Sequence, residues 1–161
     1  MKYCIECGTK LVSKYLESEN KEIPYCESCQ QYRFPIYNVA VSMIVTDLKT
    51  DKILLIQQYN KKRYILVAGY VNRAESVEDA VKREVKEETG LDVVSMKLNK
   101  TKFYEPSNTL MINFKVYVED GSLIFCNNEI DSYQWFSANG AKENIASGSL
   151  AEEFLLESFK L

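Results

Sequence analysis

The sequence predicts a sandwich of the α/β or α+β class, preceded by a small unit that a metal ion stabilises. Two Cys-x-x-Cys pairs occur within residues 1–35, and the segments after Pro35 alternate apolar and polar side chains as β-strands do. Helical segments with one apolar side lie among and after these strands. The 161 residues suffice for one domain with a real core, placed at residues 36–161, and a small appendage at residues 1–35.

The composition is that of an ordinary globular protein. Hydrophobic residues make up 46% and charged residues 27% of the chain, and its formal net charge of −3 gives no indication of bulk attraction to nucleic acid or anionic membrane. No apolar run approaches the roughly 18 residues of a membrane span. The first residues, MKYCIECG, lack the apolar region of a signal peptide, so we expect a cytoplasmic protein without a membrane partner.

The chain contains five cysteines and no histidine. The lack of histidine excludes serine–histidine and cysteine–histidine nucleophile pairs, an imidazole base and histidine metal ligands. Any chemistry must therefore come from carboxylates, lysine, tyrosine, thiolates or a bound metal ion.

Four of the cysteines have the spacing of a zinc ribbon, C-x2-C-x18-C-x2-C. We expect them to bind one structural Zn²⁺, which supplies the stability that so short a segment cannot obtain from a core. The ligands would be Cys4, Cys7, Cys26 and Cys29. A redox Cys-x-x-Cys is the alternative, but that motif normally occurs once, beside a βαβ unit. Acidic and basic residues balance within residues 1–35, which favours a structural or dimerising ribbon over one that binds nucleic acid.

The expected strands of the larger unit follow Pro35. The first three are Val39–Thr46, Asp51–Gln58 and Tyr64–Val71, of which the third is short and apolar and so expected at the centre of the sheet. Further β-rich segments cover residues 93–104, 109–118 and 132–136. The last of these ends in Trp135 and Phe136, which we expect in the core, and Cys126 would be a small buried apolar residue.

Two amphipathic helices are expected, at Val77–Thr89 and Ser149–Lys160. Ser76 followed by Asp79 resembles a capping box at the start of the first helix, and Gly90 suits the position just past its end.

The first helix carries three carboxylates on the side that its valines occupy. At about 100° per residue, Glu84, Glu87 and Glu88 fall on the same half of the helix as its apolar residues. Like charges four residues apart repel each other, and partial burial strengthens the repulsion. The single guanidinium of Arg83 does not balance three carboxylates, whereas a divalent metal ion does. Oxygen ligands alone suit Mg²⁺ or Mn²⁺.

The stretch from Gly69 to Leu91 resembles the signature of Nudix hydrolases. It reads G-x5-E-x7-R-E-V-x-E-E-x-G-L, and every fixed position is occupied. The resemblance implies an α/β/α sandwich with a mixed sheet, in which this stretch is a loop–helix–loop. It also implies hydrolysis of a phosphoanhydride in a nucleoside diphosphate that is linked to another group. One departure is Ala74, at a position where many members have glycine.

The same resemblance implies roles for individual residues. Glu84 and Glu88 would be the principal Mg²⁺ ligands, Glu87 would bind the metal or its water, and the carbonyl of Ala68 would complete the site. Arg83 would orient the carboxylates through charge-assisted hydrogen bonds.

Three further groups of candidates complete the predicted site. Glu75 would anchor the loop before the helix and assist at the metal, or would only be a charge that favours the helix dipole. Without histidine the general base is expected to be a carboxylate: Glu129 from the segment EIDSYQWF, with Glu87 as the alternative and Glu105 as a weaker one. Aromatic side chains available to contact the substrate's base are Tyr70, Phe103, Tyr104 and Phe34.

A four-cysteine ribbon directly before such a domain resembles the NADH pyrophosphatase branch, which includes enzymes that remove NAD caps from RNA. The segments that carry this resemblance are CIECG, CESCQQYRFP, AGYV, TLMINF and EIDSYQWF. They imply Mg²⁺-dependent hydrolysis of NAD(H)-like dinucleotides or related nucleoside diphosphate derivatives, with release of a nucleoside monophosphate, and they suggest a homodimer. The proline- and tryptophan-rich motif of that branch is largely absent at residues 101–107. ADP-ribose, a sugar nucleotide, NAD-capped RNA and a non-catalytic nucleotide sensor therefore stay open as alternatives.

Overall fold

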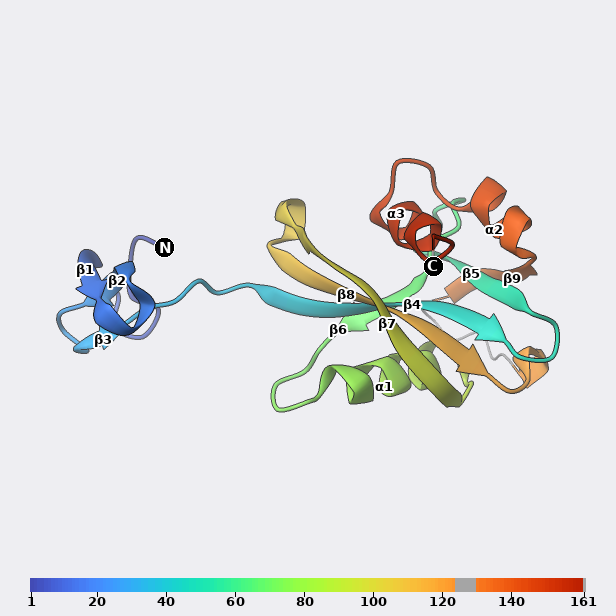
Figure 1. Ribbon diagram of the computed structural model, residues 1–161, viewed down its shortest axis with the longest axis horizontal. Helices are drawn as coiled ribbons and strands as arrows, with labels where there is room; N and C mark the ends of the chain where they lie inside the picture. Colours follow the sequence, from blue (N-terminus) through green and yellow to red (C-terminus); the bar gives the residue numbers. More distant parts are fainter. Residues whose placement is uncertain (124–129, 161) are drawn as a thin grey trace. The chain divides into compact units, whose positions relative to one another are not determined.

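The computed structural model describes residues 1–123 and 130–160. The chain divides into two compact units, Met1–Tyr37 and Asn38–Leu161 (Figure 1).

The N-terminal unit is a three-stranded antiparallel sheet in the order β1-β2-β3. Its strands are β1 (Val12–Leu16), β2 (Lys21–Cys26) and β3 (Gln31–Tyr32), with a 3-10 turn at Glu17–Glu19. Within this unit the buried apolar side chains are those of Cys4, Ile23 and Cys26. Because two of these belong to the cysteine pairs, the thiols themselves form the centre of the unit, in place of a hydrophobic core.

The C-terminal unit contains a six-stranded mixed sheet in the order β7-β8-β4-β5-β9, with β6 beside β4. The strands are β4 (Asn38–Asp47), β5 (Lys52–Gln58), β6 (Val67–Tyr70), β7 (Val93–Tyr104), β8 (Thr109–Val118) and β9 (Ile130–Phe136). Strands β4 and β8 run parallel along their whole length, and the other paired strands are antiparallel. Short 3-10 turns at Glu105–Ser107 and Gly121–Leu123 follow β7 and β8.

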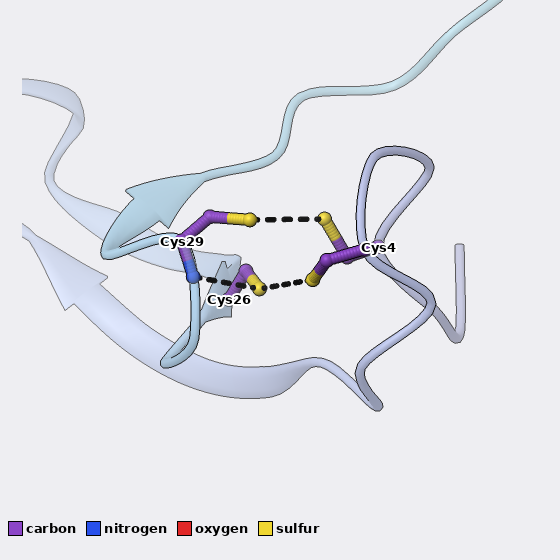
Figure 2. Close-up of side chains that lie close together, drawn as sticks. Cys4, Cys26 and Cys29 are labelled. Atoms are coloured by element: carbon purple, nitrogen blue, oxygen red, sulfur yellow. Dashed lines mark hydrogen bonds between the residues drawn. The ribbon is translucent and has the colours of Figure 1, made fainter.

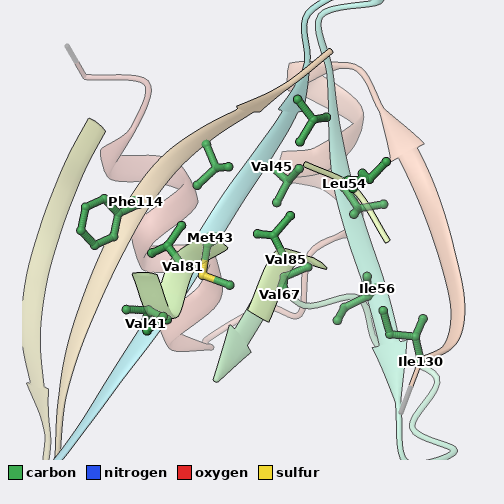
Figure 3. Close-up of a cluster of buried hydrophobic side chains, with 14 residues drawn as sticks. Val41, Met43, Val45, Leu54, Ile56, Val67, Val81, Val85, Phe114 and Ile130 are labelled. Atoms are coloured by element: carbon green, nitrogen blue, oxygen red, sulfur yellow. The ribbon is translucent and has the colours of Figure 1, made fainter. Parts of the chain in front are cut away.

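Helices cover both faces of this sheet (Figure 1). Helix α1 (Val77–Thr89) packs on one face over a large hydrophobic cluster, shown in Figure 3. Helices α2 (Ala138–Asn144) and α3 (Leu150–Glu157) cover the other face over a second cluster. Strand β4 is buried on both faces, with Met43 in the first cluster and Ile44 in the second, as the alternation of a strand requires. The predicted α/β/α sandwich with a mixed sheet is confirmed.

The helices on the second face differ from the sequence-based expectation. Helix α2 was not predicted, because its sequence ANGAKEN buries only Ala141 and so has no apolar period to recognise. Helix α3 is shorter than the expected Ser149–Lys160, because Ser149 is its N-cap and its last residue is Glu157. No helix among the described residues is both long and apolar enough to cross a membrane.

The expectation of a central third strand is wrong. Strand β6 covers only Val67–Tyr70 and, among the described residues, pairs with β4 alone. Strands β5 and β6 share one edge of β4. Strand β6 pairs with the first half of β4, and β5 pairs with the end of β4 at Thr46 and Asp47. The second edge of β6 is therefore open beside the glutamate-rich helix.

The residues expected at the end of the last strand lie at the margins of the two clusters. Trp135 is partly buried against the first cluster and donates a hydrogen bond from its Nε1 to the carbonyl of Gly121 over 3.1 Å. Phe136 is partly buried against the second. Cys126 lies outside the described residues.

Candidate functional site

The four cysteines of the N-terminal unit converge on one point (Figure 2). Their sulfur atoms all lie within 4.8 Å of one another, with Cys4 Sγ 3.9 Å from Cys29 Sγ and Cys7 Sγ 3.5 Å from Cys26 Sγ. A tetrahedral ion with metal–sulfur bonds of about 2.3 Å requires sulfur–sulfur distances of about 3.8 Å. The spacing of the thiols therefore fits a single tetrahedral metal ion.

Hydrogen-bond donors surround these sulfur atoms. Arg33 donates from Nε to Cys4 Sγ over 3.3 Å, and the N–H of Cys29 donates to Cys26 Sγ over 3.4 Å. Thr9, whose side-chain oxygen lies 3.2 Å from Cys7 Sγ, lowers the pKa of the Cys7 thiol. The backbone N–H of Cys7 and the side chain of Arg33 also lower the pKa of Cys4, whereas the neighbouring thiols, Cys7 first, raise the pKa of Cys29 to about 12. The thiolate is the form that binds a metal, so Cys4 and Cys7 are the thiols that their surroundings prepare for it.

The glutamate-rich helix α1 is fixed at both ends by caps. The N–H of Asp79 donates to Ser76 Oγ over 3.1 Å, as the predicted capping box requires. At the other end Gly90 adopts a left-handed conformation with φ 75°, and its N–H donates to the carbonyl of Lys86 over 2.9 Å. The caps fix where the helix begins and ends, and with it the direction in which each glutamate points.

Two of the three glutamates lie on the buried side of α1. Glu88 is 3% exposed and accepts a hydrogen bond from Gln58 Nε2 over 3.3 Å, while the side chain of Glu84 is 12% exposed. The side chain of Glu87 is 61% exposed, so the expectation that it points inward with the other two is wrong. Its place at the margin of the apolar side leaves it facing solvent.

A single guanidinium contacts three of the carboxylates. Arg83 binds both oxygens of Glu75, through Nε over 2.7 Å and Nη2 over 2.9 Å. Its Nη1 also donates to Glu84 over 2.6 Å and to Glu87 over 3.1 Å. Through Nη2 it further donates to the carbonyl of Tyr70 on β6 over 3.0 Å. Arg83 thus ties the helix, the preceding loop and β6 together around the carboxylates.

Glu75 is held in place by this contact. The hydrogen bonds from Arg83, and then the one from the N–H of Asn72 over 2.9 Å, lower the pKa of Glu75 to about 2. Glu75 therefore stays ionised and anchors the loop between β6 and α1, which is more than an unattached charge near the helix dipole would do.

Strand β6 approaches the carboxylate of Glu84 very closely. A Cβ atom placed on Gly69 would lie 2.0 Å from Glu84 Cδ, so only glycine leaves room for that side chain. Ala68, whose carbonyl is a predicted ligand, is the adjacent residue of β6. Glycine at residue 69 therefore avoids a clash between β6 and the candidate ligand Glu84.

The donor set on α1 fits a hard divalent cation. Its ligand atoms are carboxylate oxygens, two of them on largely buried side chains, and one guanidinium offsets only part of their charge. Among the residues that the structure describes, the cysteines form the single group of three or more candidate ligands that all converge within 4.8 Å. The α1 carboxylates do not converge in this way, because Arg83 lies among them.

A cavity of about 490 Å³ lies on the α3 side of the sheet. Its walls come from β4, β6, β8, the end of β7, helix α3 and the loop at residues 146–149, and Arg63 is the one charged side chain among the described residues that line it. A second cavity of about 180 Å³ shares Ala68, Ser107 and Met111 with the first. Both cavities thus meet at Ala68, next to the contact of Gly69 with Glu84. Ligand sites in proteins have this order of volume, roughly 300–1,000 Å³.

The predicted aromatic contacts divide into two groups. Tyr104 lines the larger cavity and Tyr70 the smaller one, whereas Phe103 and Phe34 line neither. Arg63 was missed by sequence reasoning because a short run of cations in a loop, here Lys61, Lys62 and Arg63, does not show which of them lines a cavity.

The loop at residues 146–149 was also missed. The left-handed Gly148, with φ 70°, and the N-cap Ser149 are the turn signals that could have identified it. Glu105, in the turn Glu105–Ser107, is exposed, and Glu129 lies outside the described residues.

Comparisons with known proteins agree with this geometry. Residues 36–154 match the family described as the NUDIX domain. The NAD-capped RNA hydrolase NudC of Pseudomonas aeruginosa (strain LESB58) is 28% identical over 156 residues, which cover 96% of this chain and 54% of that protein. Nudix hydrolase 19, chloroplastic, of Arabidopsis thaliana is 28% identical over 151 residues, covering 89% of this chain and 34% of that one. The chain thus spans about half the length, or less, of these curated relatives.

The solved structures show the same fold. A NUDIX hydrolase from Nitrosomonas europaea superposes with a TM-score of 0.67 at 19% identity, covering 99% of this chain and 93% of that one. A UDP-X diphosphatase superposes with a TM-score of 0.64 at 18% identity, covering 80% of this chain and 65% of that one.

Replacing Gly69 by alanine tests the contact between β6 and Glu84. The added Cβ would force the Glu84 carboxylate to move, so Gly69→Ala is expected to weaken Mn²⁺ binding at least about tenfold, measured by titration calorimetry. Gly140→Ala is the control, because its Cβ would meet nothing closer than 3.3 Å. Equal Mn²⁺ affinity in Gly69→Ala and the native chain would contradict the assignment of Glu84 as a ligand.

The departure from glycine at residue 74 has a measurable cost. Ala74 keeps a left-handed conformation with φ 63°, which costs a residue with a Cβ about 1–2 kcal/mol. Ala74→Gly is therefore expected to raise the free energy of unfolding by about 0.5–1 kcal/mol in urea titrations, after the entropy cost of glycine is subtracted. Ala151→Gly, within helix α3, should have the opposite sign. A destabilised Ala74→Gly variant would show that the loop does not hold this conformation in solution.

Proposed function

The chain belongs to the NUDIX domain family, and on that premise we propose that it hydrolyses the diphosphate linkage of NAD(H)-like dinucleotides and releases a nucleoside monophosphate. The observation that carries the proposal is the largely buried pair Glu84 and Glu88 on α1, with Glu84 in contact with Gly69 of β6, which lines the smaller cavity. Burial of two carboxylates costs free energy that Arg83 and Gln58 offset in part, and a bound divalent ion would offset the rest.

The proposed reaction breaks one phosphorus–oxygen bond. The oxygen of a water molecule bonds to one phosphorus, and the bridging oxygen leaves with the other phosphate. The water proton passes to a carboxylate of the chain. A divalent ion such as Mg²⁺ or Mn²⁺, held by Glu84, Glu88 and the carbonyl of Ala68, would neutralise phosphate oxygens and lower the pKa of bound water.

The remaining side chains position these groups. Arg83 holds the carboxylate of Glu84 in one orientation, and Glu75 in turn holds Arg83, so both act as positioning residues. Glu87 would be a further ligand for the metal or its water, because the same guanidinium nitrogen, Arg83 Nη1, holds its carboxylate and that of Glu84. Gln58, which donates to Glu88, orients that carboxylate from β5.

The general base stays a choice between two carboxylates. Glu129 is the first candidate from the sequence, and Glu87 is the candidate among the described residues. Glu87 is solvent-exposed, and Arg83 holds its carboxylate over 3.1 Å on the same helix as Glu84 and Glu88.

The two cavities suit the two halves of a dinucleotide. The larger one, with Tyr104 at its wall, would take one nucleoside, and Tyr70 beside the smaller one would contact the other. Both cavities meet at Ala68, so a diphosphate placed there would lie next to Glu84.

The cysteine unit would hold one structural zinc ion. Four thiolates at tetrahedral spacing select Zn²⁺, and the unit lacks a hydrophobic core of its own. A homodimer remains a prediction from the resemblance.

Mass spectrometry of the native protein should find close to one zinc per chain. In Cys26→Ser the zinc content should fall below about 0.1 ion per chain, because the loss of one ligand from a closed site removes most of the site's affinity for zinc. Zinc content unchanged by this substitution would contradict the assignment.

NAD-capped RNA is the second candidate substrate. Relatives named NAD-capped RNA hydrolase match nearly the whole of this chain, and the departure at residues 101–107 weakens the case for free NADH. ADP-ribose and sugar nucleotides would be hydrolysed at the same diphosphate linkage, and they differ from a dinucleotide in the group that replaces its second nucleoside. A nucleotide sensor without catalysis is disfavoured, since Glu84, Glu87 and Glu88 are all present.

The decisive variant is Glu88→Gln, which keeps the shape of the side chain and removes its charge. With Mg²⁺ and NADH, ADP-ribose, diadenosine polyphosphate or NAD-capped RNA as substrate, we expect kcat to fall at least about 100-fold, measured as nucleoside monophosphate release. Glu78→Gln, on the exposed side of the same helix, should retain native kcat. If the native protein releases no nucleoside monophosphate from any of the four substrates, the proposed function is wrong.

A further inference from the structure

A row of polar residues crosses the sheet beneath the larger cavity. The first half of β4 lies between β8 and β6 (Figure 1), and Ser42 on β4 pairs in register with Asn113 on β8 and Ala68 on β6. Residues directly opposite each other in a sheet point to the same face. Ser42 is 3% exposed and Asn113 is fully buried. Burial of such groups costs free energy unless they find hydrogen-bond partners, so their partners decide what the row can do.

A bulge in β7 adds a third polar side chain to this row. The register between β7 and β8 shifts between Leu98 and Lys100, which leaves Asn99 as the extra residue, and a bulge of this kind redirects a side chain. Asn99 donates from Nδ2 to Asn113 Oδ1 over 2.9 Å and to the main-chain carbonyl of Phe154 in α3 over 3.0 Å. Because a carbonyl can only accept, Phe154 fixes which end of the Asn99 amide carries the donor.

The direction of these hydrogen bonds orients the hydroxyl of Ser42. Asn113 accepts through Oδ1 from Asn99, so its Nδ2 faces Ser42, where it donates to the carbonyl over 3.0 Å and to Oγ over 3.2 Å. A hydroxyl has one hydrogen to donate. Since Oγ accepts from Asn113, this hydrogen points elsewhere, and among the described residues Ser42 has no partner for it.

This hydroxyl belongs to the wall of the larger cavity. Among the described residues that line the cavity, Ser42 is the one with a buried polar side chain, whereas the other polar ones are exposed or half-buried. The side chains of Leu66 and Phe154, which also line the cavity, are buried and apolar. A ligand that enters the cavity therefore meets, at its buried end, apolar side chains and one oriented hydrogen-bond donor.

We propose that Ser42 is a specificity-determining residue that donates a hydrogen bond to N1 or N3 of the adenine of the substrate. This inference rests on the proposed function and assigns the larger cavity to the adenosine half of the dinucleotide. The edge of adenine with N1 and N3 presents acceptors on either side of a C–H group, which suits one donor among apolar side chains. The carboxamide of nicotinamide also carries two N–H donors, which would face Leu66 and Phe154.

The first test is the affinity for AMP in the presence of Mn²⁺, measured by titration calorimetry. Ser42→Ala removes the hydroxyl, and the carbonyl of residue 42 still accepts from Asn113. We expect its Kd for AMP to be about tenfold weaker than that of the native chain, as for the loss of one buried hydrogen bond. Equal Kd values for Ser42→Ala and the native chain would overturn the proposal.

Ser158→Ala is the matched control for this titration. It removes a buried hydroxyl that donates to the carbonyl of Leu155 over 2.7 Å, at a residue outside the lining of the larger cavity. Its Kd for AMP should stay within about twofold of the native value. A tenfold loss in Ser158→Ala as well would attribute the effect to stability, and the proposed contact would be wrong.

Analogues of AMP test the contact on the native chain itself. In 1-deaza-AMP and 3-deaza-AMP one ring nitrogen is replaced by C–H, and one of the two should bind the native chain about tenfold more weakly than AMP does. That analogue should bind Ser42→Ala and the native chain equally, because the contact is already lost. 7-deaza-AMP keeps both N1 and N3 and should bind as AMP does. If the native chain binds all three analogues as tightly as AMP, Ser42 does not contact this edge of adenine.

AMP binding requires no turnover, so these titrations are separate from the test of the proposed function. If NAD is hydrolysed and Ser42→Ala binds AMP as the native chain does, the proposed function stands and this inference is wrong. If no substrate is hydrolysed, the proposed function fails, and the titrations still decide whether Ser42 contacts adenine.

Discussion

The arrangement of the candidate site depends on one guanidinium. Arg83 lies among Glu75, Glu84 and Glu87 and contacts all three, and through the carbonyl of Tyr70 it also joins the helix to β6. Without a cation in this place, the inward carboxylates of α1 would repel one another in a partly buried setting. The same contacts explain why Glu75 belongs to the site although it precedes the helix: it is the bidentate partner that fixes the guanidinium plane.

The two units of the chain solve the problem of stability by different means. The C-terminal unit buries two hydrophobic clusters, one on each face of β4 and β5, and needs no metal to account for its fold. The N-terminal unit buries almost nothing except its own thiols, so its stability is tied to whatever those thiols bind. The candidate oxygen ligands on α1 and the sulfur atoms of the cysteine unit would also select different metals, hard cations for the first and Zn²⁺ for the second.

Much of the fold and part of the site could be predicted from the sequence, because these features depend on signals within short stretches of the chain. The limits of α1 followed from Ser76 and Gly90, and the ribbon followed from cysteine spacing alone. Features that depend on tertiary contacts were missed or misjudged: β6 at an open edge, the polar helix α2, and the outward direction of Glu87.

The cavity could not be predicted either. Its walls come from segments as far apart in the chain as Ser42 and Phe154. The spacing of apolar residues in a sequence does not show which loops come together in the folded protein. The turn signals of Gly148 and Ser149 mark the loop at residues 146–149 in the sequence, but only the paired strands show that this loop and Arg63 line one cavity.

The parallel pairing of β4 with β8 has a consequence for how the protein assembles. It joins Asn38 to Thr109 and Asp47 to Val118, so about seventy residues of chain must be closed into a loop before the first of these contacts can form. The helix, its arginine and the adjacent glycine lie within that loop and contact one another at short range. The carboxylate cluster therefore depends on contacts that are local in sequence, whereas the surface that would receive a nucleoside depends on the long-range pairing of β4 with β8.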